Sequence, residues 1–141
     1  MLFSDKRLSF RKIRLKRPTV YCLPGFHIDP VWRKTQAEYI EESIGLIRQY
    51  LLACRADPYF GVYLSELDYL KPYLDLYPEE HAWIASLIQQ ERSTTGGSYN
   101  QPNETTIGGE ALIRNILVGM TYHNSICDHH PLVYMGWDVF G

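Results

Sequence analysis

The sequence has few cysteines and no long apolar run, and both absences limit what it can encode. No apolar stretch approaches the ~18 residues of a membrane-spanning helix. The basic N-terminus lacks the apolar stretch and the small-residue cleavage site of a signal peptide. Cys22, Cys54 and Cys127 are far apart and form no Cys-x-x-Cys pair, which argues against a disulfide framework or a thiolate zinc site. We therefore expect a cytoplasmic protein without a membrane partner, whose cysteines are buried free thiols.

The remaining composition is that of a globular domain. The 141 residues are 45% apolar and 13% aromatic, which suits one domain with a core and excludes a disordered chain. We find no internal repeat and no low-complexity tract. The net charge of −2 argues against a general nucleic-acid binder.

Positive charge is concentrated at the N-terminus. Residues 1–17 hold seven of the 14 basic side chains and a single acid, Asp5, so we divide the chain into a basic arm, 1–17, and a domain, 18–141. Such an arm can contact an acidic partner or nucleic acid, but no aromatic ladder accompanies these charges. A solvated leader is the simpler interpretation, and we expect no nucleic-acid partner.

The apolar pattern predicts alternating strands and helices. Short apolar runs indicate buried strands, and apolar residues at steps of three and four indicate amphipathic helices. The predicted strands are 19–23, 59–64 and 131–137, and the predicted helices are 33–54, 65–73, one beginning near Pro78, and 110–123. The last helix is apolar on more than one side, so we expect it to be largely covered. This order is typical of an α/β fold with a parallel sheet.

The last predicted strand, 131–137, is not followed by a helix before the sequence stops. Three or four parallel strands close a core poorly, so we expect these residues to be the N-terminal part of an incomplete barrel-like parallel sheet. A small domain that is complete as it stands is the alternative.

Polar side chains follow each predicted strand. They are His27, Asp29 and Trp32 after the first strand, Ser65 and Glu66 after the second, and Asp138 after the third. Because functional groups of parallel sheets gather beyond the carboxyl ends of the strands, we expect these residues to share one rim.

The run His27-Ile28-Asp29 has the spacing of half a metal site. Side chains two apart in an extended segment point the same way, and Pro30 keeps Asp29 out of helical torsions. Nitrogen and oxygen donors suit Zn²⁺, with Asp138 as the natural third ligand. There are two alternatives: that His27 and Asp29 only share a hydrogen bond, and that Asp138 only caps a turn.

Ordered blocks of the sequence resemble glycoside hydrolase family 38, the α-mannosidases. The blocks are FHIDPVW at 26–32, FGVYLSE at 60–66, the Gly-Gly pair at 96–97 with Pro102-Asn103 and GEALIR at 109–114, and DVFG at 138–141. The sequence departs from the family at Gly25, where a histidine is usual, at Ser98, where tryptophan is frequent, and at Asn103, where aspartate is common.

The resemblance implies a zinc-dependent retaining glycosidase with a seven-stranded α/β barrel. It implies that His27, Asp29 and Asp138 bind the zinc, that Asp138 is also the catalytic nucleophile, and that Trp32 lies under the sugar. A further histidine ligand and the general acid/base would follow later in a longer chain, so residues 1–141 alone should be inactive. The implied substrate is an α-mannoside or a related oligosaccharide.

Two other functions stay open at this point. The first is another metal-dependent carbohydrate hydrolase, such as a deacetylase, in which Asp138 is the base for a zinc-bound water. The second is an inactive binding fragment, because the acid/base and the last metal ligand are missing. The sequence leaves linkage preference, aglycone and oligomeric state open.

Overall fold

The computed structural model describes residues 20–64, 66–128 and 131–140, so the basic arm lies outside the described residues. Its helices are α1 (Gln36–Ala56), α2 (Leu67–Leu76), the short 3₁₀ helix η1 (Pro78–Glu80), α3 (His81–Gln89) and α4 (Gly109–Ile126), and its strands are β1 (Val62–Tyr63) and β2 (Ser93–Thr94). The four predicted helices are confirmed, each close to its predicted bounds. No helix in the described ranges is both long enough and apolar enough to cross a bilayer.

The strands are short and parallel. Val62 and Tyr63 of β1 pair with Ser93 and Thr94 of β2. On its other side Tyr63 forms a parallel bridge with Gly25, and its N–H donates to the carbonyl of Pro24 over 2.8 Å. Three segments therefore run side by side in one direction, with β1 in the middle. Helices combined with parallel strands confirm the α/β class.

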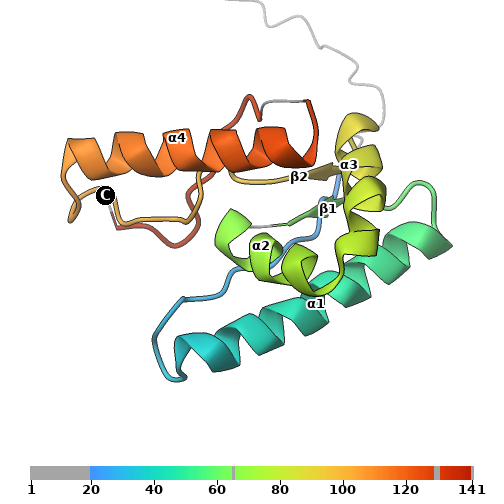
Figure 1. Ribbon diagram of the computed structural model, residues 1–141, viewed down its shortest axis with the longest axis horizontal. Coiled ribbons are helices and arrows are strands. Elements are labelled where there is room, and N and C mark those ends of the chain that lie inside the picture. Colours follow the sequence, from blue (N-terminus) through green and yellow to red (C-terminus); the bar gives the residue numbers. More distant parts are fainter. Residues whose placement is uncertain (1–19, 65, 129–130, 141) are drawn as a thin grey trace, which may run out of the picture.

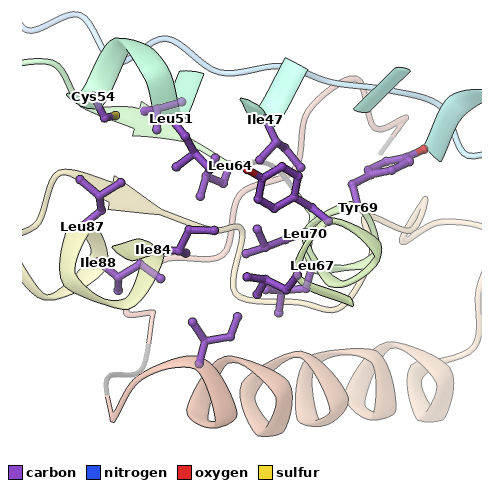
Figure 2. Packing of buried hydrophobic residues seen from close by; sticks show 14 of the residues in the cluster. Ile47, Leu51, Cys54, Leu64, Leu67, Tyr69, Leu70, Ile84, Leu87 and Ile88 are labelled. Carbon is purple, nitrogen blue, oxygen red and sulfur yellow. The ribbon is translucent and has the colours of Figure 1, made fainter. Parts of the chain in front are cut away.

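The helices enclose the strands and supply most of the core. Figure 1 shows α1 and α4 on opposite sides of the strands, with α2 and α3 packed between them. In Figure 2 apolar side chains from α1, α2 and α3 converge on Leu64, the residue after β1. Ile47, Leu67, Leu70, Ile84 and Leu87 are almost completely buried. Each such side chain contributes about 1.5–3 kcal/mol by leaving water, so this core holds β1 in place.

Two predicted strands are wrong. Within residues 20–23 no strand forms, and Val20 and Tyr21 are 79% and 92% exposed, because backbone pairing with β1 begins only at Pro24 and Gly25. Described residues 131–137 also form no strand. This segment is joined to the residues after β2 by one backbone hydrogen bond, from Met135 N–H to the Gly96 carbonyl over 3.2 Å, rather than by the repeated backbone hydrogen bonds of a strand pair. Leu132 is correspondingly 94% exposed.

Two predictions of burial are also wrong. Cys54 and Cys127 are buried as expected, but Cys22 is exposed because it lies in the unpaired segment before Gly25. The second apolar side of α4 is open, with Ile113, Leu117 and Val118 each more than half exposed. Within the described residues, α4 packs through its other side, where Gly119, His123 and Ile126 are buried.

Gly119 allows α4 to approach the loop that follows β2. A Cβ atom at this position would lie 2.4 Å from the carbonyl carbon of Ser98, so any side chain would displace the loop. Asn115, one turn earlier, exchanges two hydrogen bonds with the backbone of Asn100, at 3.0 Å and 2.7 Å. These contacts fix the start of the loop 100–103, which borders the site described next.

Candidate active site

The carboxyl ends of the parallel segments open into a cavity of about 590 Å³. Its walls come from five parts of the chain: the residues after Gly25, the junction of β1 and α2, the loop after β2, the first turns of α4, and residues 137–140. His27, Asp29, Glu66 and Asp138 all line it, so four of the residues predicted to share a rim do so. Ser65, also predicted there, lies outside the described residues.

The His27-Ile28-Asp29 run is held by its middle residue. Ile28 is 8% exposed and belongs to the core, and its carbonyl accepts a 3.1 Å hydrogen bond from the buried hydroxyl of Tyr69. Alternation along an extended segment then sends the two flanking side chains to the opposite face. The result is that His27 and Asp29 both border the cavity.

His27 lies between two carboxylates. Its Nε2 is 3.8 Å from Oδ1 of Asp29, and its Nδ1 is 3.7 Å from Oε1 of Glu66. The side chains of His27 and Asp29 are 28% and 45% exposed, whereas that of Glu66 is 6% exposed. The imidazole therefore has a solvent-accessible carboxylate at one nitrogen and a buried carboxylate at the other.

Asp68 adds another acidic group to the wall. It lies in the first turn of α2, and its Oδ1 is buried with no hydrogen-bond partner among the described residues. Burial, and next the negative charge of Glu66, raise the pKa of Asp68 to about 7. The prediction of rim residues did not include Asp68. The signal that could have found it is its position two residues after Glu66, where a predicted strand passes into a helix.

Asp138 occupies an unusual backbone conformation. Its φ of 51° lies in the left-handed region, which non-glycine residues rarely adopt and which is frequent at functional sites. Hydrogen bonds on either side hold the segment. The Gln101 side chain donates to the Trp137 carbonyl, and the Thr105 hydroxyl donates to the Phe140 carbonyl over 2.8 Å. The loop after β2 thus positions Asp138 at the cavity.

The donors of a metal site are only partly assembled. A zinc ion held tetrahedrally at about 2.0–2.2 Å by two ligands keeps those ligands on the order of 3.4 Å apart. The 3.8 Å between His27 Nε2 and Asp29 Oδ1 is close to that spacing, so this pair fits a zinc ion. However, no three His, Cys, Asp or Glu side chains in the described residues are grouped closely enough to hold a metal. Asp138 shares the cavity with the pair without completing such a group.

The aromatic side chain predicted to lie under a sugar is outside this cavity. Trp32 is not among the described residues that line it. The residue is 66% exposed, and the Arg33 guanidinium lies 4.2 Å from its ring centroid. Trp137 lines the cavity instead, with its ring stacked on Tyr63 at a centroid distance of 5.6 Å.

Comparison with known proteins identifies the family. The model of the glycosyl hydrolases family 38 N-terminal domain matches residues 17–141, so the chain belongs to this family, as the sequence blocks indicated. No curated protein matches the chain.

Two solved structures from Enterococcus faecalis are similar in fold. One is an α-mannosidase from strain V583, with a TM-score of 0.68 and 22% identity, matching 78% of this chain and 12% of that one. The other is described as a protein of glycosyl hydrolase family 38, with a TM-score of 0.69 and 23% identity, matching 84% of this chain and 14% of that one. The present chain therefore spans only a small part of the length of these structures.

Proposed function

We propose that this chain is the N-terminal part of the catalytic domain of a zinc-dependent retaining glycosidase that acts on α-mannosides. The observation that carries the proposal is the cavity at the carboxyl ends of the parallel segments. The chain belongs to family 38, and His27, Asp29 and Asp138 all line this cavity. The three parallel segments would correspond to the first strands of the seven-stranded barrel that the sequence resemblance implies.

Asp138 is the proposed nucleophile. Its carboxylate attacks the anomeric carbon, the bond to the leaving oxygen breaks, and a glycosyl ester of Asp138 forms; water then hydrolyses this ester. The leaving oxygen takes its proton from a second carboxylic acid, which in retaining enzymes lies about 5–5.5 Å from the nucleophile. We place that acid in the part of the enzyme beyond this chain.

His27 and Asp29 are the proposed zinc ligands of this chain, together with Asp138. When bound, zinc would supply a Lewis acid for the sugar hydroxyls and stabilise the oxocarbenium-like transition state. The nearby positive charge would also favour the ionised form of a ligating carboxylate, which suits a nucleophile. Trp32, which is 66% exposed, and Trp137, which lines the cavity, are the proposed aromatic contacts of the sugar ring.

The nucleophile is tested by Asp138→Ala in the full-length enzyme. Turnover of an activated α-mannoside should fall by several orders of magnitude because no glycosyl ester can form. Asp75→Ala, which removes a surface carboxylate paired with Lys71, is the matched control and should keep full turnover. Wild-type turnover in Asp138→Ala would remove the assignment.

Trapping distinguishes a glycosidase from a zinc-dependent deacetylase. A fluorinated mannosyl fluoride should leave a slowly hydrolysed sugar ester on Asp138, detected by mass spectrometry of the peptide. A deacetylase that uses Asp138 as a base forms no such ester. An unmodified peptide together with release of acetate from an acetylated sugar would favour the deacetylase.

A further inference from the structure

We propose that Glu66 is the positioning residue for His27: in the metal-loaded enzyme it closes the present 3.7 Å separation, accepts a hydrogen bond from Nδ1–H and thereby leaves Nε2 free to bind the metal. This inference rests on the proposed function, because it names the support of one proposed zinc ligand. It assigns a role to a side chain that the reaction itself does not use.

The two ring nitrogens of His27 face different carboxylates. Nδ1 is 3.7 Å from Oε1 of Glu66, and Nε2 is 3.8 Å from Oδ1 of Asp29, the second proposed ligand. A metal held by His27 and Asp29 together must therefore take Nε2. Nδ1 is then the nitrogen that carries the proton, and Glu66 is the acceptor next to it.

Burial separates the roles of the two carboxylates. The Glu66 side chain is 6% exposed, whereas that of Asp29 is 45% exposed. Glu66 is also the N-cap residue of α2, yet its side chain makes no capping hydrogen bond to that helix. The positive end of the helix dipole favours a negative charge at this position. A buried carboxylate held at a helix terminus is suited to fixing a ring, while the accessible one is suited to meeting an ion.

A histidine ligand depends on such a partner in a measurable way. The outer carboxylate fixes the tautomer and the orientation of the ring and raises its basicity, and its loss typically costs about 10–100-fold in metal affinity. Removing the carboxylate of Glu66 should therefore lower the zinc affinity. A neutral side chain that keeps an oxygen acceptor should retain part of that affinity.

The test is the zinc affinity of the full-length enzyme, measured by competition with a chelator at fixed pH. Glu66→Ala should raise the zinc dissociation constant about 10–100-fold, and Glu66→Gln should raise it by less, because its amide oxygen can still accept from Nδ1–H. Glu42→Gln, which alters an exposed carboxylate paired with Lys34, should leave it unchanged. Circular dichroism of each variant checks that α2 and the fold persist.

A crystal structure of the zinc-loaded wild type supplies the second readout. It should show zinc on Nε2 of His27 and Nδ1 within hydrogen-bond distance of Glu66. Zinc on Nδ1, or zinc affinity within about twofold of wild type in a folded Glu66→Ala, would overturn the inference and leave the zinc site itself intact. A wild type that binds no zinc would overturn both the inference and the metal part of the proposed function.

Discussion

At the residue scale, the site depends on one extended run whose middle residue is buried. Ile28 packs into the core and is tied to Tyr69, so His27 and Asp29 face the cavity. This arrangement was predictable from the sequence, because alternation in an extended segment is a local property. The roles of the two carboxylates at the start of α2 were harder to predict from the sequence. Glu66 was expected at the rim, but its contact with the far nitrogen of His27 required the folded chain.

The raised pKa of Asp68 predicts a specific pH dependence of stability. In the folded state this pKa is about 7, against an ordinary value of 3.8. Between about pH 4 and 7 the folded protein keeps a proton that the unfolded chain has released, so stability falls as the pH rises through this window. Asp68→Asn stays neutral and should remove that loss. Its stability relative to wild type should therefore be greater at about pH 8 than at about pH 5.

Denaturant unfolding at the two pH values measures this difference. Asp75→Asn is the control on the same helix, because its carboxylate is 61% exposed and paired with Lys71. If Asp68→Asn and wild type differ by the same free energy at both pH values, Asp68 is not the group that titrates.

At the element scale, helices were easier to predict than strands. In α1 the apolar spacing of a helix continues over enough residues to identify the helix from the sequence. Thr35 and Glu38 form a reciprocal capping box at its start. The strands are only two residues long, and β2 consists of Ser93 and Thr94, which form no apolar run. Strands were predicted instead at the apolar residues 20–23 and 131–137, although the described parts of both segments are largely exposed. Pairing of so few residues is decided by packing around β1, which the sequence pattern does not contain.

Arg92, just before β2, fixes the turn between α1 and β1. Its guanidinium donates to the carbonyls of Cys54 and Asp57, both over 2.7 Å, and to that of Phe60 over 3.1 Å. Arg92→Ala removes the guanidinium donor from these carbonyls, of which that of Asp57 also accepts a backbone hydrogen bond from Phe60 N–H, and we expect a loss of about 1–3 kcal/mol in the free energy of unfolding. Arg114→Ala, which breaks an exposed pair with Glu110, should cost at most about 0.5 kcal/mol. Equal losses in the two variants, measured by denaturant unfolding, would contradict the role given to Arg92.

At the scale of the whole molecule, the parallel arrangement assembles the site. His27 and Glu66 are far apart in sequence and meet because adjacent parallel segments present their carboxyl ends to one cavity, where the loop after β2 also holds Asp138. This convergence was predicted from polar residues at strand ends even though two of the strands were wrong. For His27 and Glu66 the order and direction of the segments were enough, whereas Asp138 reaches the cavity through contacts with the loop after β2. The inclusion of Asp68 and Trp137 could not be predicted, since it depends on how the loop after β2 and the last described residues fold over the cavity.

The central claim is that His27 and Asp29 hold a divalent ion at this cavity. The most direct test is metal analysis of the purified full-length enzyme, wild type against His27→Ala and Asp29→Asn, with Glu42→Gln as the control. We predict about one zinc per chain in the wild type and in the control, and a large loss of zinc in both ligand variants. Unchanged zinc content in folded His27→Ala and Asp29→Asn, or a wild type without zinc, would contradict the account.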